Sequence, residues 1–441
     1  MNKNNNKRKL SKQKIFSAIS AGFIIACCIF YGTKFIKLYL ENKKELKLNE
    51  DALVNTIMEE NEKKEDKFKK INSSYYFTGK ADNNYVIYSN ILWRIVKINS
   101  DNTIKLVSED ILTYLAYDNK VTNFKDSYIG KWLNNKDEEN EGILIKELDN
   151  TSLVNDKVCT DKIEKANNQE CNKYEEDLYA SLLSVADYMN AGGSKSYLNI
   201  SKNFYLSSID DDKSWYISTT GKAQTNDGKD IYGIRPTITL GSATKEDKGT
   251  GTKDNPYVIN TDNKFASYVK LGKDVYRIFE TDDEYYKLSL NSLLKEDGEE
   301  LDYIYSNKTY YHNDTDYGSL AYYLNNTYLK SLSYKDNIDE TKWANGVLNK
   351  NLNYTSCLNT KVDTKVATLS IGNVILNNLD NYFLMSGNEE KKNLVYIVND
   401  DGTTETINVT DPANIIPTIA IKKEILTKGK GTIEEPYEVE E

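Results

Sequence analysis

The sequence predicts an α+β protein: two tandem copies of one mixed module that follow a transmembrane helix and a helical stalk. Three observations predict this. A long uncharged segment lies near the N-terminus, charged residues at helical spacing follow it, and short sequence blocks recur in the same order about 180 residues apart. We expect a basic cytoplasmic head at 1–14, a membrane helix at 15–37, a stalk at 38–72 and extracellular modules at 73–260 and 261–441.

The uncharged segment IFSAISAGFIIACCIFYGT, residues 15–33, has nineteen residues, which is just enough to cross a bilayer. Six Lys or Arg residues precede it, so the charge bias favours a cytoplasmic N-terminus and export of the rest of the chain. Two alternatives remain open. The residues Ile24 to Cys27 match a bacterial lipoprotein signal, which would place a lipid on Cys27, and a secretory signal could be cleaved. All three alternatives place the C-terminal bulk outside the cell.

The segment after the membrane helix carries acids four positions before lysines, for example Glu59 before Lys63 and Glu60 before Lys64. Such pairs stabilise a solvent-exposed helix. A continuous helix from about residue 34 to residue 70 would extend about 55 Å at 1.5 Å per residue. We therefore expect a stalk that holds the modules away from the membrane.

The two modules are predicted from blocks that recur in order. YVIYSNILWRI aligns with YVKLGKDVYRI, TIKLVSEDIL with YYKLSLNSLL, SLLSVADYMN with TLSIGNVILN, FYLSS with YFLMS, SWYIST with LVYIVN and GIRPTITL with NIIPTIAI. GTGTKDNPYVI (249–259) also matches GKGTIEEPYEV (429–439), so each copy ends on the same phrase. The second copy is the more degenerate one.

Each module is expected to combine a β-hairpin, helices and later strands. The elements expected in the first module are strands at 75–79, 84–89, 92–98, 103–109, 203–208, 214–219 and 232–240, and helices at 128–134 and 177–193. The longer helix is predicted from apolar residues at helical spacing, namely Leu178, Leu182, Val185 and Met189.

Charge and cysteine content narrow the class of partner and the compartment. The net charge is −10, and residues 1–37 carry eight basic residues and no acid, which leaves −18 on the remainder. Such a body repels phosphate backbones, so we expect no nucleic-acid partner. Cys159 and Cys171 flank a short polar segment without a nearby His or further Cys, which favours a disulfide over a metal site, although a reduced pair is the alternative.

The residues for common catalytic mechanisms are missing from the sequence. The single histidine, His312, lies in a polar loop with no nucleophile motif before it, and no Cys/His cluster suits zinc. Paired carboxylates remain an option that the sequence cannot assign to particular acids. We therefore expect no enzyme activity, no catalytic residue, no metal and no cofactor.

Binding residues are sought where the first module differs from the second. Trp215 and Arg235 are replaced by Val395 and Ile416, and Tyr216 adjoins Trp215, so these three are the candidate binding residues. Ordinary divergence of core residues is the alternative interpretation.

Two arginines occupy the same strand position in both modules. Arg94 and Arg277 each lie among aromatic and β-branched residues. A structural ion pair is the simplest interpretation of an arginine in a half-buried strand.

The blocks LWRIVKI, LLSVADYMNA, YGIRPTITL and GTGTKDNPYVI resemble an uncharacterised extracellular domain family of low-GC Gram-positive bacteria. Its members often follow a membrane helix or a pilin-like N-terminal helix, and the resemblance covers roughly residues 73–441. LLSVADY and YGIRP are also distantly similar to the C-type-lectin-like fold, which includes relatives of the formylglycine-generating enzyme. The second resemblance implies a fold and no activity, because the catalytic cysteines of the enzymes have no counterpart.

These observations lead us to expect a membrane-anchored bacterial cell-surface protein that binds or adheres to an extracellular protein or glycan. A structural or assembly subunit of the cell envelope is one alternative. An envelope glycan hydrolase that uses carboxylates is another.

Overall fold

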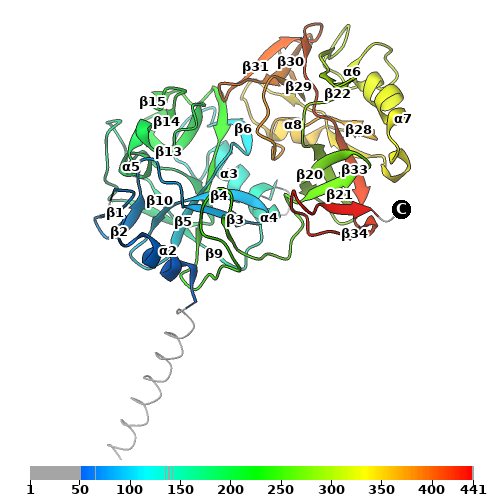
Figure 1. The fold of residues 1–441 in the computed structure, drawn as a ribbon. Coiled ribbons are helices and arrows are strands. Elements are labelled where there is room, and N and C mark those ends of the chain that lie inside the picture. Colours follow the sequence, from blue (N-terminus) through cyan, green and yellow to red (C-terminus); the bar gives the residue numbers. More distant parts are fainter. Residues whose placement is uncertain (1–50, 65, 135, 138–139, 142, 440–441) are drawn as a thin grey trace, which may run out of the picture.

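The computed structural model describes the chain from residue 51 to residue 439, with gaps at residues 65, 135, 138–139 and 142. This part of the chain is mostly β-sheet (Figure 1), with 38% strand and 14% helix. The α+β prediction is therefore wrong. The longest described α-helix, α2 (Leu53–Asn61), has only nine residues, so sheets form the bulk of the core.

Several predicted N-terminal features lie outside the described residues. These are the basic head (1–14), the membrane helix (15–37), the alternative lipidation site Cys27 and the start of the stalk (38–50). In the part of the chain that is described, no helix has the length and apolar character needed to span a bilayer.

The stalk prediction is wrong from residue 51 onward. Helix α2 lies against the first sheet with Leu53 and Ile57 buried, and the Leu53 N–H donates to the Thr244 carbonyl at 2.8 Å. Strand β1 (Phe68–Ile71) then joins that sheet. Burying one large aliphatic side chain stabilises by about 1.5–3 kcal/mol, whereas an exposed ion pair at i,i+4 stabilises by about 0.2–0.5 kcal/mol. Packing of the apolar residues therefore prevails over an extended charged helix.

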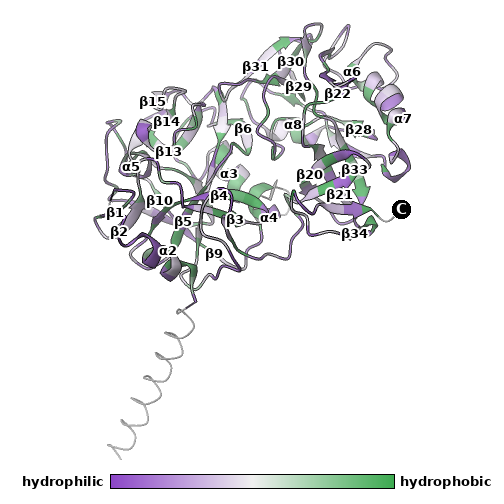
Figure 2. Cartoon of the chain, in the orientation of Figure 1, coloured by the Kyte–Doolittle hydropathy of each residue, from purple (hydrophilic) through white to green (hydrophobic). Residues whose placement is uncertain are grey.

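The first half of the chain builds a nine-stranded sheet with the path β1-β2-β4-β5-β17-β12, to which β3, β9 and β18 are added. Its strands are β1, β2 (Ser74–Phe77), β3 (Tyr85–Tyr88), β4 (Ile91–Ile98), β5 (Ile104–Ser108), β9 (Leu153–Val154), β12 (Ala180–Leu182), β17 (Pro236–Leu240) and β18 (Tyr257–Val258). The predicted hairpin is present as β4 and β5. Hydrophobic residues concentrate on the inner strands and hydrophilic residues on the loops (Figure 2).

A second sheet of the first half has the order β15-β14-β13-β16-β6, and β10 and β11 form a separate hairpin. The bounds are β6 (Thr113–Ala116), β10 (Asp156–Cys159), β11 (Tyr174–Leu178), β13 (Phe204–Asp210), β14 (Lys213–Ile217), β15 (Ala223–Asn226) and β16 (Ile231–Ile234). The smaller elements are α3 (Tyr128–Asn134), β7 (Lys136–Asp137), β8 (Asn140–Glu141), α4 (Ile143–Glu147), α5 (Val185–Asn190) and η1 (Gly193–Lys195).

The two helix predictions for the first half fare differently. Helix α3 is present at 128–134, as predicted. The helix predicted at 177–193 is wrong, because β11 and β12 occupy its first part and only α5 is helical. Ser184 begins α5 by accepting a hydrogen bond from the Asp187 N–H. Leu178 and Leu182 are buried as strand residues instead.

The second half builds a seven-stranded sheet, β28-β33-β21-β20-β19-β35-β34, and a four-stranded sheet, β26-β29-β30-β31. The bounds are β19 (Tyr268–Leu271), β20 (Asp274–Thr281), β21 (Tyr285–Leu290), β26 (Val347–Leu348), β28 (Val366–Ala367), β29 (Tyr382–Asn388), β30 (Leu394–Val398), β31 (Thr404–Asn408), β33 (Thr418–Lys422), β34 (Leu426–Lys428) and β35 (Tyr437–Val439). Three strand pairs are separate: β22 (Lys295–Glu296) with β23 (Glu299–Glu300), β24 (Tyr303–Ile304) with β32 (Pro412–Ala413), and β25 (Thr341–Ala344) with β27 (Lys361–Thr364). The helical elements are α6 (Leu320–Tyr322), the π-helical η2 (Tyr323–Tyr328), α7 (Leu329–Ser331), η3 (Lys335–Asn337), α8 (Thr355–Asn359) and η4 (Lys423–Ile425).

The large sheets of the two halves share one strand order. In the first half β18, β3, β4, β5, β17 and β12 are neighbours in that sequence, and β35, β19, β20, β21, β33 and β28 repeat it. The last strand of each half pairs in parallel with the equivalent partner: β18 with β3 in the first half and β35 with β19 in the second. The recurring blocks of the sequence therefore lie on strands that occupy equivalent sheet positions.

The closing phrases also adopt equivalent turns. Gly249 and Gly429 have φ angles of 115° and 96°, in the region that favours glycine. A Cβ atom at Gly249 would lie 1.9 Å from the Pro256 carbonyl oxygen, and one at Gly429 would lie 2.1 Å from that of Pro436. Only glycine fits either position, which explains why a glycine stands there in both phrases.

The two halves pack against each other. The Trp132 indole N–H donates to the Gly372 carbonyl at 2.9 Å, and the Ile375 N–H donates to the Leu112 carbonyl at 2.8 Å. These buried contacts join α3 and the loop before β6 to the segment that follows β28. The halves are therefore joined through their cores as well as by the connecting segment.

Candidate functional site

A polar groove of about 420 Å³ lies in the first half, between the β1–β2 turn, the end of β4, α5 and the loop from β10 to β11. Its lining is dominated by side chains that carry amides, hydroxyls and charges. The polar lining residues include Asn72, Ser73, Ser74, Tyr76, Lys97, Asn99, Lys157, Gln169, Asn172, Tyr174, Glu176, Asp187 and Asn190. Tyr174 is 47% exposed, which leaves much of its aromatic ring open to solvent at the groove.

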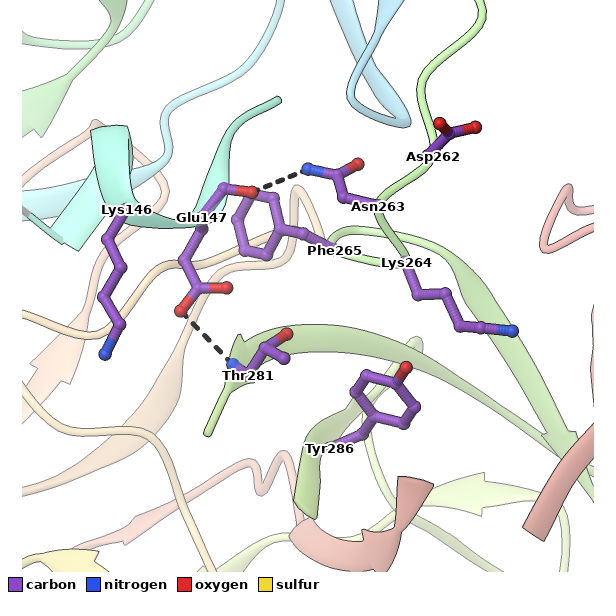
Figure 3. Close-up of a pocket in the computed structure, with 8 residues that line it drawn as sticks. All are labelled: Lys146, Glu147, Asp262, Asn263, Lys264, Phe265, Thr281 and Tyr286. Atoms are coloured by element: carbon purple, nitrogen blue, oxygen red, sulfur yellow. Dashed lines mark hydrogen bonds between the residues drawn. The ribbon is translucent and has the colours of Figure 1, made fainter. Parts of the chain in front are cut away.

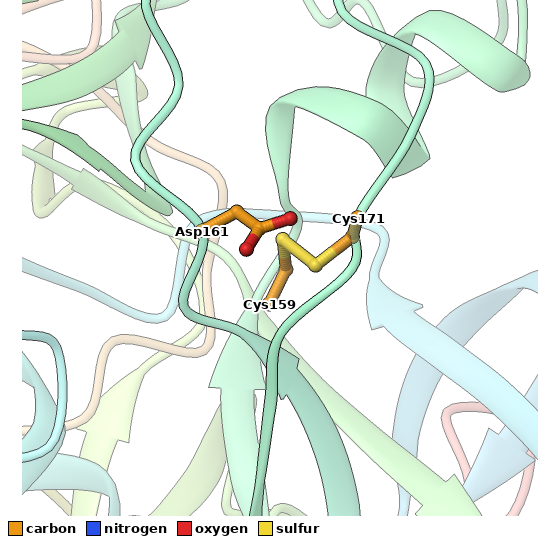
Figure 4. Close-up of side chains that lie close together, drawn as sticks. All are labelled: Cys159, Asp161 and Cys171. Carbon is orange, nitrogen blue, oxygen red and sulfur yellow. A yellow bond between two sulfur atoms is a disulfide. The ribbon is translucent and has the colours of Figure 1, made fainter.

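One wall of the groove is held by a disulfide. Cys159 ends β10 and bonds to Cys171 in the loop that leads to β11 (Figure 4). Asp161 lies beside the two sulfur atoms, and its carboxylate accepts a hydrogen bond from the Asn172 N–H. Because both sulfurs are used in the disulfide, these three residues do not offer thiolate ligands to a metal. Their arrangement shapes the loop instead.

The floor of the groove is an ion pair with a tyrosine. The Lys97 ammonium lies 2.8 Å from Asp187 Oδ1, and the Tyr76 hydroxyl donates to the same oxygen at 3.1 Å. The Lys97 side chain is 12% exposed and that of Asp187 is 5% exposed. Lys97 comes from β4, Tyr76 from β2 and Asp187 from the first turn of α5, so three elements meet at this point.

A second ion pair lies beneath the first. The Lys105 ammonium is 3.1 Å from Asp156 Oδ2 and 3.5 Å from Asp187 Oδ2. Asp156 also accepts hydrogen bonds from the Ser181 and Thr239 hydroxyls at 2.6 and 2.9 Å. Each buried charge in this layer therefore has a partner of opposite sign.

Electrostatics keep the floor ionised. Burial alone would raise the pKa of Asp187, but the ammonium groups of Lys97 and Lys105 lower it well below its usual range. Burial alone would lower the pKa of Lys97, but Asp187 raises it above the usual lysine value. Burial and Asp187 raise the pKa of Tyr76 to about 12, which keeps the phenol neutral. At neutral pH these groups present fixed charges and hydrogen-bond donors, and no proton is ready to be transferred.

The sequence carries a signal for this floor that the prediction of binding residues missed. Lys97 and Lys105 interrupt the apolar strands LWRIVKI and TIKLVS, and a lysine in a buried strand requires a carboxylate partner. The partners Asp156 and Asp187 are distant in sequence, so pairing them required the three-dimensional structure.

The predicted binding residues lie away from the groove. Trp215 is buried, and its indole N–H donates to the Ile163 carbonyl at 2.8 Å. Tyr216 is half-buried and its hydroxyl donates to Gln224 Oε1 at 2.7 Å. Arg235 is 1% exposed and has its own internal partners. None of the three lines the groove.

Arg235 and Arg94 both have partners inside the protein. Arg235 donates to the Ser108 and Leu198 carbonyls, and burial lowers the pKa of its guanidinium. Arg94 lies 3.4 Å from Glu109, with its guanidinium 3.8 Å from the ring centroid of Tyr85.

The second-half arginine has different partners from the first. Arg277 donates to the Ala266, Leu376 and Asn90 carbonyls at 2.7, 3.1 and 3.1 Å. Asn90 belongs to the first half, so Arg277 also contributes to the contact between the halves.

A smaller pocket of about 320 Å³ lies where the halves meet (Figure 3). The Glu147 carboxylate, at the end of α4, accepts a hydrogen bond from the Thr281 N–H at 3.2 Å, and the Glu147 carbonyl accepts one from the Asn263 amide at 2.8 Å. Burial raises the pKa of Glu147 to about 7, and the charge of Glu280 adds to this increase. Glu147 is therefore a buried acid that titrates near neutral pH.

Comparisons of the chain with protein-family models, with curated proteins and with solved structures give no match. A function for this chain is therefore inferred from the geometry of its pockets.

Proposed function

We propose that the chain is a single-pass bacterial cell-surface protein, and that its first half binds an extracellular protein or glycan in the polar groove. The observation that carries this proposal is the groove of about 420 Å³ with its ionised Lys97–Asp187 floor. Fixed charges beneath amides and hydroxyls suit recognition of a polar ligand, because the binding groups are already positioned.

The compartment is supported by the disulfide. The bond between Cys159 and Cys171 is of the kind that persists in an oxidising environment outside the cytoplasm. The uncharged segment at residues 15–33 provides the route for export and the anchor. Protease added to intact cells should digest the acidic body of an anchored, exported protein, and protection until lysis would contradict this location.

The binding test uses the full-length chain in detergent, applied to glycan and protein arrays and to extracellular-matrix preparations. Tyr174→Ala and Asn172→Ala remove a ring and an amide at the groove without touching the core. We expect each to weaken binding by about fivefold, which corresponds to a contact of about 1 kcal/mol. Ile433→Ala removes an exposed apolar side chain of the second half that does not line the groove, and it is the control. Wild-type protein that binds none of these preparations would contradict the proposal.

An envelope subunit is the first alternative function. It predicts that the chain co-purifies from membranes in a stable complex and that the groove substitutions leave this complex intact. Loss of the complex in Tyr174→Ala would instead assign the complex to the groove.

The glycan-hydrolase alternative has one specific observation in its favour, which is Glu147. A general acid needs a raised pKa, and Glu147 has one. The pKa values of Asp187 and Asp156, in contrast, are lowered. Asp262 lines the same pocket and would be the second carboxylate. This alternative predicts that the protein releases soluble fragments from cell-wall glycan and that Glu147→Gln abolishes the release.

A further inference from the structure

The second half presents an unusual set of exposed tyrosines. Tyr317 is 81% exposed and Tyr311 is 51% exposed, and both lie in the loop that precedes α6. Large aromatic side chains are costly to leave in water, and tyrosines at such positions are enriched in binding interfaces.

The tyrosine rings around Tyr317 form two pairs, which are joined through the consecutive residues Tyr322 and Tyr323. Tyr317 meets Tyr322 edge-on, with 5.2 Å between ring centroids, and Tyr303 stacks on Tyr323 at 4.8 Å. Burial raises the pKa of Tyr303 and of Tyr323, and the charge of Glu296 adds to both increases. Tyr322 and Tyr323 lie at the junction of α6 with the π-helical η2, and π-helical turns often accompany functional sites.

The surroundings of the cluster are acidic. Residues 295–317 carry seven Asp or Glu and two Lys, and one of these lysines, Lys308, lies 3.1 Å from Asp316. Glu296 and Glu299 are exposed cross-strand partners in the β22–β23 hairpin. Like charges held opposite each other repel, so a cation that binds there gains attraction to both.

Elsewhere in the described part of the chain, several tyrosine rings lie next to a lysine or arginine of the protein itself. The guanidinium of Arg94 lies 3.8 Å from the Tyr85 ring and that of Arg277 lies 4.4 Å from the Tyr268 ring. Among the described residues, no lysine or arginine lies over the rings of the exposed cluster. The cluster therefore has the partners of a cation site, rings and carboxylates, and the Tyr317 ring is open to solvent.

We propose that this tyrosine–carboxylate surface, made of Tyr303, Tyr317, Tyr322, Tyr323 and Glu296, binds lysine or arginine side chains of a basic extracellular polypeptide. The rings supply cation–π attraction and the carboxylates supply charge complementarity. A neutral glycan would gain from the rings and nothing from the acids, so the charge of the surface favours a basic polypeptide. This surface is separate from the groove of the first half, so an experiment can contradict one of the two binding proposals and leave the other intact.

The test measures binding of a fluorescent lysine-rich peptide to the full-length protein in detergent by fluorescence anisotropy. Tyr317→Ala should raise the Kd by about two- to fivefold, the loss expected for one exposed cation–π contact. Tyr317→Phe keeps the ring and should retain most of the affinity. Ile433→Ala, which removes an exposed apolar side chain outside both proposed sites, should leave the Kd unchanged. Glu296→Gln should weaken binding and reduce its dependence on salt.

Comparing Tyr317→Ala with Tyr317→Phe distinguishes binding at this site from the general attraction of a polycation to an acidic protein. Equal affinity in wild type, Tyr317→Ala and Tyr317→Phe would overturn the proposal. A neutral glycan that loses affinity in Tyr317→Ala while the peptide does not would assign the surface to glycans and also overturn it. Self-association that Tyr317→Ala abolishes, with no effect on the peptide, would assign the surface to a second copy of the chain.

Discussion

Hairpins β4–β5 and β20–β21 share one geometry but neutralise their charges in different ways. Both contain a bulge, after which Lys97 faces Lys105 in the first half and Glu280 faces Lys287 in the second. The second pair is self-sufficient, with Lys287 Nζ 2.7 Å from Glu280 Oε1. The first hairpin places two like charges side by side, so it needs acids from elsewhere in the fold.

The acids that neutralise Lys97 and Lys105 lie in segments whose sequence differs in the second half. The Val185 N–H donates to the Ser208 hydroxyl and the Ile371 N–H donates to the Ser386 hydroxyl, so these positions are equivalent. By this equivalence the counterpart of Asp187 in the second half is Asn373. The gapless alignment of the two sequence blocks differs from this by one position. The same sheet arrangement therefore holds a charge network beneath a groove in the first half, and in the second half it holds the ion pair of Glu280 with Lys287.

The largest expected effect comes from breaking the first charge network. Asp187→Asn leaves Lys97 and Lys105 short of a negative partner, and removing one member of a buried ion pair costs about 3–5 kcal/mol in the free energy of unfolding. Glu280→Gln in the second half should cost about 1 kcal/mol or less, because this carboxylate is partly exposed, at 35%. Urea denaturation of the two variants checks the difference, and equal losses would contradict the comparison.

The same network predicts a loss of stability in acid. The pKa of Asp187 is lower in the folded protein than in the unfolded chain, so the unfolded chain binds more protons as the pH falls. The stabilisation by Asp187 is complete above its unfolded pKa of about 3.9 and is lost as the pH falls toward the folded pKa. Asp187→Asn should therefore flatten the acid limb of a plot of unfolding free energy against pH.

The disulfide should give the next largest effect, and it too belongs to the first half. Cys159 and Cys171 are 12 residues apart, and closing a loop of this length stabilises by about 3 kcal/mol in the chain-entropy account. Replacing both by serine should lower the unfolding free energy by about that amount and loosen the groove wall. Cys357 is a buried free thiol of the second half, so a reducing agent has no bond to break there. A melting temperature that dithiothreitol does not change would contradict this prediction.

The contact between the halves should respond to pH through Glu147. Its folded pKa of about 7 lies above the ordinary value of 4.5, so the folded protein binds the extra proton and stability falls as the pH rises between these values. Glu147→Gln keeps an oxygen for the Thr281 N–H and removes the buried charge. We expect it to stabilise the protein by about 1–3 kcal/mol at pH 8 and to have little effect at pH 4. Thermal unfolding at both pH values provides the measurement, and a pH-independent effect would contradict it.

The smallest effect is expected at a residue that sequence comparison of the halves favoured. Tyr216→Phe removes one half-exposed hydrogen bond to Gln224, so the free energy of unfolding should change by about 0.5 kcal/mol or less. Ligand binding by the groove should be unchanged, because Tyr216 does not line it. A large loss of binding in this variant would restore Tyr216 as a binding residue and move the site to β14.

The candidate site was harder to predict than the strands. Alternating apolar residues located β4 and β5, and the recurring blocks located their counterparts β20 and β21. The same method misplaced the helix at 177–193, because Leu178 and Leu182 have helical spacing but are buried as strand residues. Differences between the modules pointed to Trp215 and Arg235, which the structure places in the interior. Substitutions inside a core and substitutions at a binding site look alike until burial is known.

The sequence by itself determined the recurring order of strands, the glycine turns at Gly249 and Gly429 and the acidity of the body, because these follow from local spacing, backbone sterics and composition. Tertiary structure alone decided that α2 and β1 pack onto a sheet, that the halves join through their cores, and that Asp156 and Asp187 neutralise Lys97 and Lys105. Those outcomes depend on which distant residues share a low-dielectric interior, where burial and charge pairing outweigh local propensity.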